Sequence, residues 1–223
     1  MRRPPRLSKT RIGILGAVLC LLPLLAACGG GGADDSGSAD PDVAYAEPTP
    51  VGEGWDRTIK RYRVAVDAHM ASEEGPLTPE QRAGFGGLDY YPPDPSYYFV
   101  VDPDRSKAGE PISFYDTKGN RRYYTVHSQV HLRMGAHTAT LTIYLAQGGE
   151  YLFLPFQDAT TGEETYEVGR YLELRERPDG TVVLDFNLAK NPYCAYGDRW
   201  ACPTVPAANH MDFPIRAGEK MYH

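Results

Sequence analysis

The chain has 223 residues and carries 23 basic against 29 acidic side chains, which gives a formal net charge of −6. Removal of the first 27 residues, which hold five basic side chains and no acidic one, would leave 18 against 29, or −11. A protein this acidic lacks the positive surface that binds a phosphate backbone, so we expect no nucleic acid partner.

The N-terminus has the pattern of a secretory signal peptide. A basic segment, MRRPPRLSKTR, precedes an apolar run that begins at Ile12. This run has about 15 residues, fewer than the roughly 20 that a transmembrane helix needs. It ends in LAAC, residues 25–28, which matches the lipoprotein box, where the cysteine receives diacylglycerol before the leader is cut off. We therefore predict a signal peptide over residues 1–27 and a membrane anchor on Cys28.

The predicted anchor sets the expected location and domain organisation. The membrane partner is reached through the diacylglyceryl group, in the cell envelope, on the outer face of the plasma membrane or on the outer membrane. Residues 28–53, the lipidated cysteine and a segment rich in Gly, Asp, Ser and Pro, form a linker without apolar periodicity. Residues 54–223 are a normal length for a single domain.

Two helices are expected at the start of this domain. Apolar residues recur at spacings of four, three, four and four between Trp55 and Met70, which places them on one face of a helix. A second, short helix follows, because Thr78 can cap it, Pro79 suits its first turn and Gln81 completes a capping box.

The remaining sequence changes to the alternating pattern of strands. Seven segments alternate apolar and polar residues or consist of buried-strand residue types, and short turns rich in Gly, Asp and Asn join several of them: residues 97–101, 112–116, 122–133, 138–145, 151–156, 171–176 and 181–186. We therefore predict a mainly β fold, an antiparallel β-sandwich or partly closed barrel with an N-terminal helix. The proline-rich tail after residue 187 is expected to wrap the surface as an ordered loop.

Cys194 and Cys202 raise three possibilities: a disulfide, a pair of metal ligands, or a reactive thiol with its partner. An oxidising compartment favours the disulfide, and the spacing closes a nine-residue ring. A zinc ion would need two further ligands, and His210 is the only nearby candidate. His127 and His131 lie roughly 13 Å apart along one predicted strand, too far to share an ion. We predict the disulfide, no metal and no cofactor.

Four sequence blocks resemble a bacterial family called domain of unknown function 1684. The resemblance runs from about residue 55 to residue 220, and the blocks are PLTPEQRAGFGGLDYYPPDP, LFLPFQDATTGEETYEVGRYLEL, VVLDFNLAKNPYCAYGDRWACP and PIRAGEK. One departure is His210, which stands where members typically carry an arginine. The resemblance implies no established activity, but it directs attention to polar residues far apart in the sequence. Gathered together, they would form a pocket.

The resemblance and the polar composition of residues 158–170 define a candidate pocket. Its members are Asp158, Thr161, Glu164, Tyr166, Arg170, Asn187, Asn191, Arg216 and Glu219. The main hypothesis is a binding or accessory lipoprotein that holds a small polar ligand there.

Two alternatives stay open. One is a hydrolase-like enzyme that uses the Asp158, Glu164 and Arg170 cluster or the thiol of Cys194, although no complete catalytic constellation is visible. The other is a glycan-contacting surface built on Tyr90, Tyr91, Tyr97 and Tyr98. The sequence identifies no catalytic residue and leaves the oligomeric state open.

Overall fold

The structure is a computed structural model that describes residues 50–146 and 151–222. The predicted signal peptide, Cys28, nearly all of the predicted linker and the predicted turn at residues 147–150 lie outside the described residues. Among the described residues, no helix is both long enough and apolar enough to cross a membrane.

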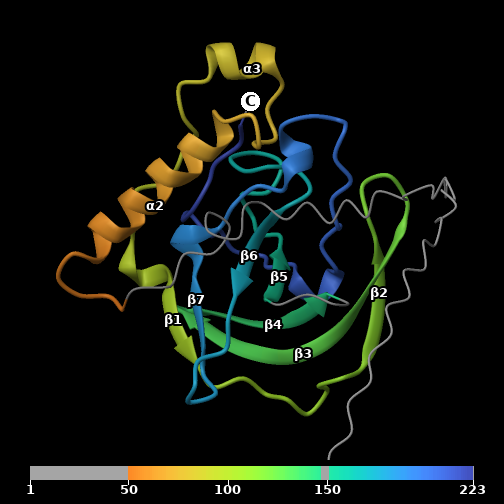
Figure 1. Ribbon diagram of the computed structural model, residues 1–223. Coiled ribbons are helices and arrows are strands. Elements are labelled where there is room, and N and C mark those ends of the chain that lie inside the picture. Colours follow the sequence, from red (N-terminus) through yellow and green to blue (C-terminus); the bar gives the residue numbers. More distant parts are fainter. Residues whose placement is uncertain (1–49, 147–150, 223) are drawn as a thin grey trace, which may run out of the picture. The chain divides into compact units, whose positions relative to one another are not determined.

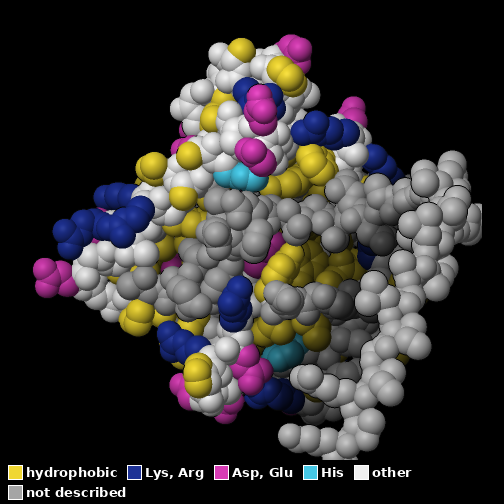
Figure 2. All heavy atoms as spheres, viewed as in Figure 1, with side chains coloured by type: hydrophobic (Ala, Val, Ile, Leu, Met, Phe, Trp, Pro, Cys, Tyr) yellow, Lys and Arg dark blue, Asp and Glu magenta, His cyan; other side chains and the backbone are white. Residues whose placement is uncertain are grey.

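Both predicted helices are present at the start of the domain. Helix α2 spans Trp55–Met70 and buries Trp55, Ile59, Val66 and Met70 on the face that the spacing predicts. Helix α3 spans Pro79–Gly84 and has the expected capping box. On the face shown in Figure 2, basic and acidic side chains are mixed over both helices, which identifies this side of the helices as solvated.

All the predicted strands are present and form two antiparallel sheets. The larger sheet has the order β2-β3-β4-β5-β6, and β1 pairs with β7 in the smaller one. The bounds are β1 Tyr98–Val101, β2 Pro111–Tyr115, β3 Arg121–Met134, β4 His137–Ala146, β5 Leu152–Phe156, β6 Arg170–Leu174 and β7 Val182–Asp185. In Figure 1 the long strands β3 and β4 curve strongly, but β2 and β6 remain edges, so the described sheets do not close into a barrel. The mainly β prediction is confirmed.

A bulge in β3 changes the face of the large sheet on which the buried residues of this strand lie. The register with β4 shifts between Val126 and Ser128. Before the bulge, Tyr124 and Val126 face an aromatic cluster, and after it Val130 and Leu132 face the aliphatic core. Because one extra residue reverses the alternation, the same strand supplies buried residues to both faces.

The tail after β7 is an ordered loop, as expected, but much of it is buried. It contains three short 3-10 turns, η2 Phe186–Leu188, η3 Tyr193–Ala195 and η4 Ala207–Asn209. Ile215 and Ala217 are fully buried in the aliphatic core. The amide of Asn209 donates to the carbonyl oxygens of Thr142 and Pro155, at 2.8 Å each, which joins the tail to β4 and to β5. The expectation of a surface wrapping is therefore wrong in part, because the tail completes the core.

Gly169, directly before β6, lies where the chain packs closely against the end of β5 and against the tail. Its φ is +105°, and a Cβ atom there would lie 2.5 Å from the carbonyl oxygen of Phe156 and 2.8 Å from a methyl carbon of Val205. Gly162 also has a positive φ, +83°, but no atom lies within 4 Å of its ideal Cβ position. Both glycines therefore have a left-handed backbone conformation, but only Gly169 lacks the space for a Cβ atom.

We predict that Gly169→Ala lowers the free energy of unfolding by about 3 kcal/mol or more, because a steric clash adds to the strain of a left-handed residue. The matched change Gly162→Ala carries the strain alone and should cost about 1–2 kcal/mol. Denaturant unfolding of both variants measures the difference. Equal losses would show that the contact with Phe156 and Val205 does not limit the packing.

Candidate functional site

The structure does not gather the predicted pocket residues around one cavity. Arg170, the first residue of β6, is 1% exposed. Its guanidinium donates to the carboxylate of Asp158 at 2.7 Å and to the carbonyl oxygen of Ile215 at 2.7 Å. It also donates to the carbonyl oxygens of Ala217 and Glu219. Arg170 is therefore a buried cross-link between the sheet and the C-terminal segment.

The second carboxylate oxygen of Asp158 also accepts hydrogen bonds. Its Oδ1 atom accepts hydrogen bonds from the backbone N–H and the hydroxyl of Thr160, at 2.7 Å and 2.5 Å. The hydroxyl of Thr161 in turn accepts from the backbone N–H of Asp158 at 3.1 Å. Because Asp158 and Arg170 are buried and mutually paired, neither is placed to exchange a proton with an external substrate.

Three further predicted residues make separate contacts between segments. Arg216 forms an exposed two-point ion pair with Glu164, at a shortest distance of 2.6 Å, and the hydroxyl of Tyr91 donates to the same carboxylate at 2.9 Å. The amide of Asn187 donates to the carboxylate of Asp185 at 2.8 Å. Arg216 and Glu164 are therefore paired with each other, whereas Asn187 makes its contact elsewhere.

Glu219 lies in a second buried polar cluster. The backbone N–H of Asn191 and the hydroxyl of Tyr196 both donate to its Oε2 atom, at 2.7 Å and 2.9 Å. Burial raises the pKa of the Glu219 carboxyl to about 7, although these hydrogen bonds and the charges of Lys190 and Arg170 favour the ionised form. The group therefore titrates near neutral pH.

The tyrosines that suggested a glycan surface do not form an exposed row. Tyr91 is buried, and the guanidinium of Arg63 covers the ring of Tyr90 at 4.5 Å from its centroid. The hydroxyl of Tyr97 accepts from the backbone N–H of Arg216 at 3.3 Å. These rings pack within the domain rather than presenting a common stacking platform.

Cys194 and Cys202 are adjacent but are not joined in a disulfide; both are present as thiols. The backbone N–H of Cys194 donates to the sulfur of Cys202 at 3.0 Å. A hydrogen bond from the Cys202 thiol, assisted by Tyr166, lowers the pKa of Cys194. The disulfide expected from the spacing is thus absent, and the sulfur of Cys202 accepts a backbone hydrogen bond in its place. The hydroxyl of Tyr166 also donates to the carbonyl oxygen of Cys194 at 3.1 Å.

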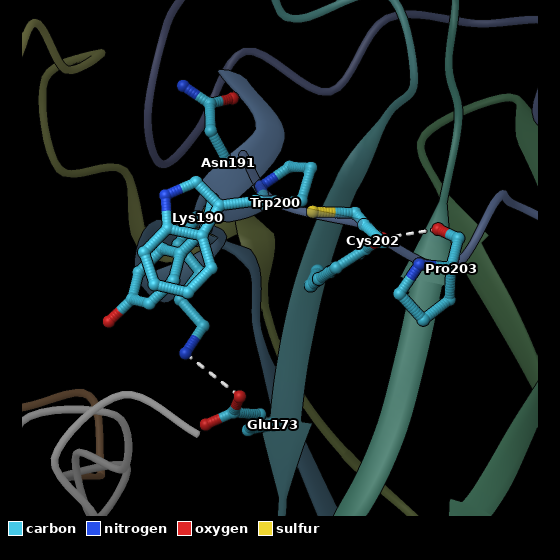
Figure 3. A pocket seen from close by; sticks show the side chains of 10 residues that line it. Glu173, Lys190, Asn191, Trp200, Cys202 and Pro203 are labelled. Carbon is cyan, nitrogen blue, oxygen red and sulfur yellow. Dashed lines mark hydrogen bonds and ion pairs between the residues drawn. The ribbon is translucent and has the colours of Figure 1, made fainter. Parts of the chain in front are cut away.

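A pocket of about 70 Å³ lies beside this thiol pair, between β6 and the tail. It is lined by Tyr171, Glu173, Lys190, Asn191, Pro192, Tyr193, Trp200, Ala201, Cys202 and Pro203. Figure 3 shows the Glu173–Lys190 ion pair on one side, Cys202 and Pro203 on another, and Asn191 at the end away from Glu173. Of the predicted pocket residues, Asn191 lines this cavity.

The polar end of this pocket is formed by Glu173 and Lys190. Lys190 pairs with the Oε1 atom of Glu173 at 2.9 Å, and the Glu173 side chain is 9% exposed. Among the described residues, the buried Oε2 atom of Glu173 has no hydrogen-bond partner, and neither has the buried Oδ1 atom of Asn191 at the other end of the pocket. A buried oxygen without a donor costs roughly 1–3 kcal/mol.

The apolar wall of the pocket is held firmly to the rest of the domain. The ring centroids of Tyr193 and Trp200 lie 5.0 Å apart, and the two ring planes meet at 58°. Arg199 stacks over Trp200 at 4.7 Å and donates to the carbonyl oxygen of Pro76 at 2.7 Å. The backbone N–H of Thr117 donates to the carbonyl oxygen of Cys202 at 2.9 Å. The connection between α2 and α3 and the turn after β2 therefore both position this wall.

Sequence reasoning missed Glu173, Lys190 and Trp200 as members of this site. Glu173 carried a usable signal, because it is a carboxylate in the buried strand β6, whose neighbours Leu172 and Leu174 face the core. Lys190 and Trp200 carried none, because their approach depends on how the tail folds. Across residues 50–146 and 151–222 no group of three or more His, Cys, Asp or Glu side chains could hold a metal ion.

Comparison with known proteins places the chain in a family. The family described as "Protein of unknown function (DUF1684)" matches residues 83–220, more than half of the chain, and the chain belongs to it. The fold is also similar to the solution NMR structure of an uncharacterized protein from gene locus rrnAC0354 of Haloarcula marismortui. The two share 31% identity with a TM-score of 0.59, over 75% of this chain and 95% of that one. No curated protein matches the chain.

The titration of Glu219 predicts a pH dependence of stability. An unfolded glutamate ionises near pH 4.5, whereas the folded group keeps its proton to about pH 7. Between these values the folded state binds more protons than the unfolded state, so stability falls as pH rises, by on the order of 3 kcal/mol in total. Glu219→Gln should remove this decline, whereas the exposed control Glu163→Gln should keep it.

Urea unfolding at a series of pH values from 4.5 to 8 measures both variants against the unmodified chain. Parallel pH profiles for all three proteins would contradict the assignment of this titration to Glu219.

Proposed function

We propose that this protein is a lipid-anchored envelope protein that binds a small polar ligand in the pocket between β6 and the tail. The observation that carries the binding role is the concave pocket itself, in which the ion pair of Glu173 and Lys190 lies beside the rings of Tyr193 and Trp200. Aromatic walls with a few polar groups are typical of small-molecule sites.

The anchoring part of the proposal rests on the N-terminal sequence. A basic segment, an apolar run and the LAAC box precede a linker of Gly, Asp, Ser and Pro residues. Acylation of Cys28 with two or more chains gives stable membrane attachment, since one chain alone binds only reversibly. The linker, of about 25 residues with a reach of roughly 25–30 Å, would let the domain sample ligand above the lipid surface.

We predict that Cys28→Ala removes the added mass of the acyl chains, because the modified sulfur is lost, and leaves the leader uncut, because lipid addition precedes cleavage. The control Cys20→Ala changes a cysteine within the predicted leader and should leave the protein on the membrane. Detergent phase partitioning and the intact mass of the purified protein measure the two outcomes. A Cys28→Ala variant that is still cut ahead of residue 28, or an unmodified protein without the mass of acyl chains, would contradict the anchor.

The ligand site is tested by filling the pocket without changing its polar groups. Ala201 lines the pocket, so Ala201→Phe should displace a ligand while leaving Glu173, Lys190 and Asn191 in place. Ala83 in α3 is exposed and lines no part of this pocket, so Ala83→Phe is the matched control.

We predict that saturation-transfer NMR of the whole chain against a library of small polar metabolites yields binders, and that Ala201→Phe weakens them at least tenfold. The physical reason is steric, since a phenyl group occupies the cavity volume that the ligand needs. Ala83→Phe should leave binding unchanged. Binders that are unaffected by Ala201→Phe would place the ligand elsewhere, and a library without binders would contradict the binding role.

A further inference from the structure

We infer that Cys194 and Cys202 form a dithiol that exchanges with a small disulfide, in which Cys194 attacks and Cys202 resolves the mixed disulfide. This inference goes beyond the proposed ligand binding and does not depend on it. It follows from the contact between the two thiols, from their unequal exposure and from the cavities beside them.

The two thiols are close enough to react with each other. The backbone N–H of Cys194 donates to the sulfur of Cys202 at 3.0 Å. The Cys202 thiol is in turn hydrogen-bonded to the sulfur of Cys194. Because the sulfurs are in direct contact, small side-chain movements suffice to join them. The segment therefore holds both members of a dithiol–disulfide couple, in its reduced form.

The exposure of the two residues assigns a role to each. Cys194 is half-buried in the turn η3, whereas Cys202 is 6% exposed. The backbone also fixes Cys202, because its N–H donates to the hydroxyl of Thr117 at 3.2 Å and its carbonyl oxygen accepts from the N–H of Thr117 at 2.9 Å. A disulfide from outside therefore reaches Cys194 first, and Cys202 stays in place to resolve the product.

Local hydrogen bonds favour the thiolate of Cys194. The hydrogen bond from the Cys202 thiol lowers the pKa of Cys194, although burial opposes it, and the hydroxyl groups of Tyr166 and Thr117 act in the same direction as Cys202. The thiolate is the nucleophile in disulfide exchange. These contacts therefore increase the reactive fraction of Cys194 near neutral pH.

The cavities beside the pair suit a small disulfide. Cys202 lines the pocket of about 70 Å³ between β6 and the tail, and Figure 3 shows it at the wall of this pocket. A second cavity, of about 320 Å³, is lined by Tyr166 and Ala195, which are neighbours of Cys194. A half-buried thiol beside cavities of this size admits a flexible small molecule more readily than a disulfide inside a folded protein.

The exchange balances in two steps. The thiolate of Cys194 attacks one sulfur of the external disulfide, forms a mixed disulfide and releases one thiolate, which takes up the proton that Cys194 lost. Cys202 then loses its proton to the second leaving sulfur, attacks the sulfur of Cys194 and forms the Cys194–Cys202 disulfide. The two protein thiols are oxidised, and the external disulfide, which is the oxidant, is reduced to two thiols.

The exchange is tested on the whole chain, reduced beforehand, with bis(2-hydroxyethyl) disulfide as a neutral probe that the acidic protein does not repel. Trypsin cuts after Arg199 and so separates Cys194, in residues 191–199, from Cys202, in residues 200–216. Mass spectrometry of the acid-quenched, alkylated digest should show these two peptides joined, with two small thiols released for each joined pair. Peptides that are never joined would overturn the inference.

Variants of the two cysteines test the assigned roles. Cys202→Ala should stop the reaction at a mixed disulfide on Cys194, because the resolving thiol is lost. Cys194→Ser leaves the buried thiol alone and should form a mixed disulfide more slowly than Cys202→Ala, by roughly tenfold or more. A mixed disulfide that forms equally fast on Cys202 in Cys194→Ser would overturn the inference.

The pH profile of the first step separates a reactive thiol from a merely structural one. Tyr166→Phe removes a hydroxyl that favours the Cys194 thiolate, so its rate of exchange should rise at higher pH than that of the unmodified protein. Tyr123→Phe changes a tyrosine that is 61% exposed on β3 and should leave the profile unchanged. Identical profiles for both variants would contradict the assignment of the attack to Cys194.

Insulin supplies a protein disulfide for comparison. Each reaction is scaled to the rate at which dithiothreitol reduces the same disulfide. We expect the pair to prefer the small disulfide, and faster reduction of insulin on this scale would overturn the inference of a small substrate.

Discussion

The described domain depends on one buried interaction, the guanidinium of Arg170 with the carboxylate of Asp158 and three carbonyl oxygens of the C-terminal segment. Burying this charge carries a large desolvation cost, which only a nearly complete set of partners can offset. Arg170 meets that condition because it begins β6 and the tail supplies acceptors from Ile215, Ala217 and Glu219. The positions of β6, the loop after β5 and the tail are therefore set together.

The candidate pocket lies at the end of the same chain of contacts. Arg170 holds the backbone of Glu219, whose side chain accepts from the backbone N–H of Asn191. Asn191 lines one end of the pocket, and Glu173, three residues after Arg170 on β6, lines the other. Several polar residues that the sequence assigned to the pocket thus support the walls of this candidate pocket, which is lined largely by other residues.

Local patterns predicted the elements well because their causes are local. The spacing from Trp55 to Met70, the capping box at Thr78 and the alternating strands each depend on a few neighbouring residues. The site could not be predicted in the same way. The positions of Lys190 and Trp200 depend on contacts with segments about 17 to 124 residues away, such as Glu173 and Pro76. Asp158 and Arg170 were predicted as pocket residues, but the structure shows them as a buried ion pair. Composition alone cannot distinguish an exposed acid and base from a buried ion pair.

The most direct test of this account is native-state hydrogen exchange in Arg170→Lys, which keeps the charge but cannot reach three carbonyl oxygens. The account predicts faster exchange of the backbone amides of Asn191 and Glu219 together, while amides of β3 and β4 keep their protection. Unchanged exchange at Asn191 would contradict the claim that Arg170 positions the pocket.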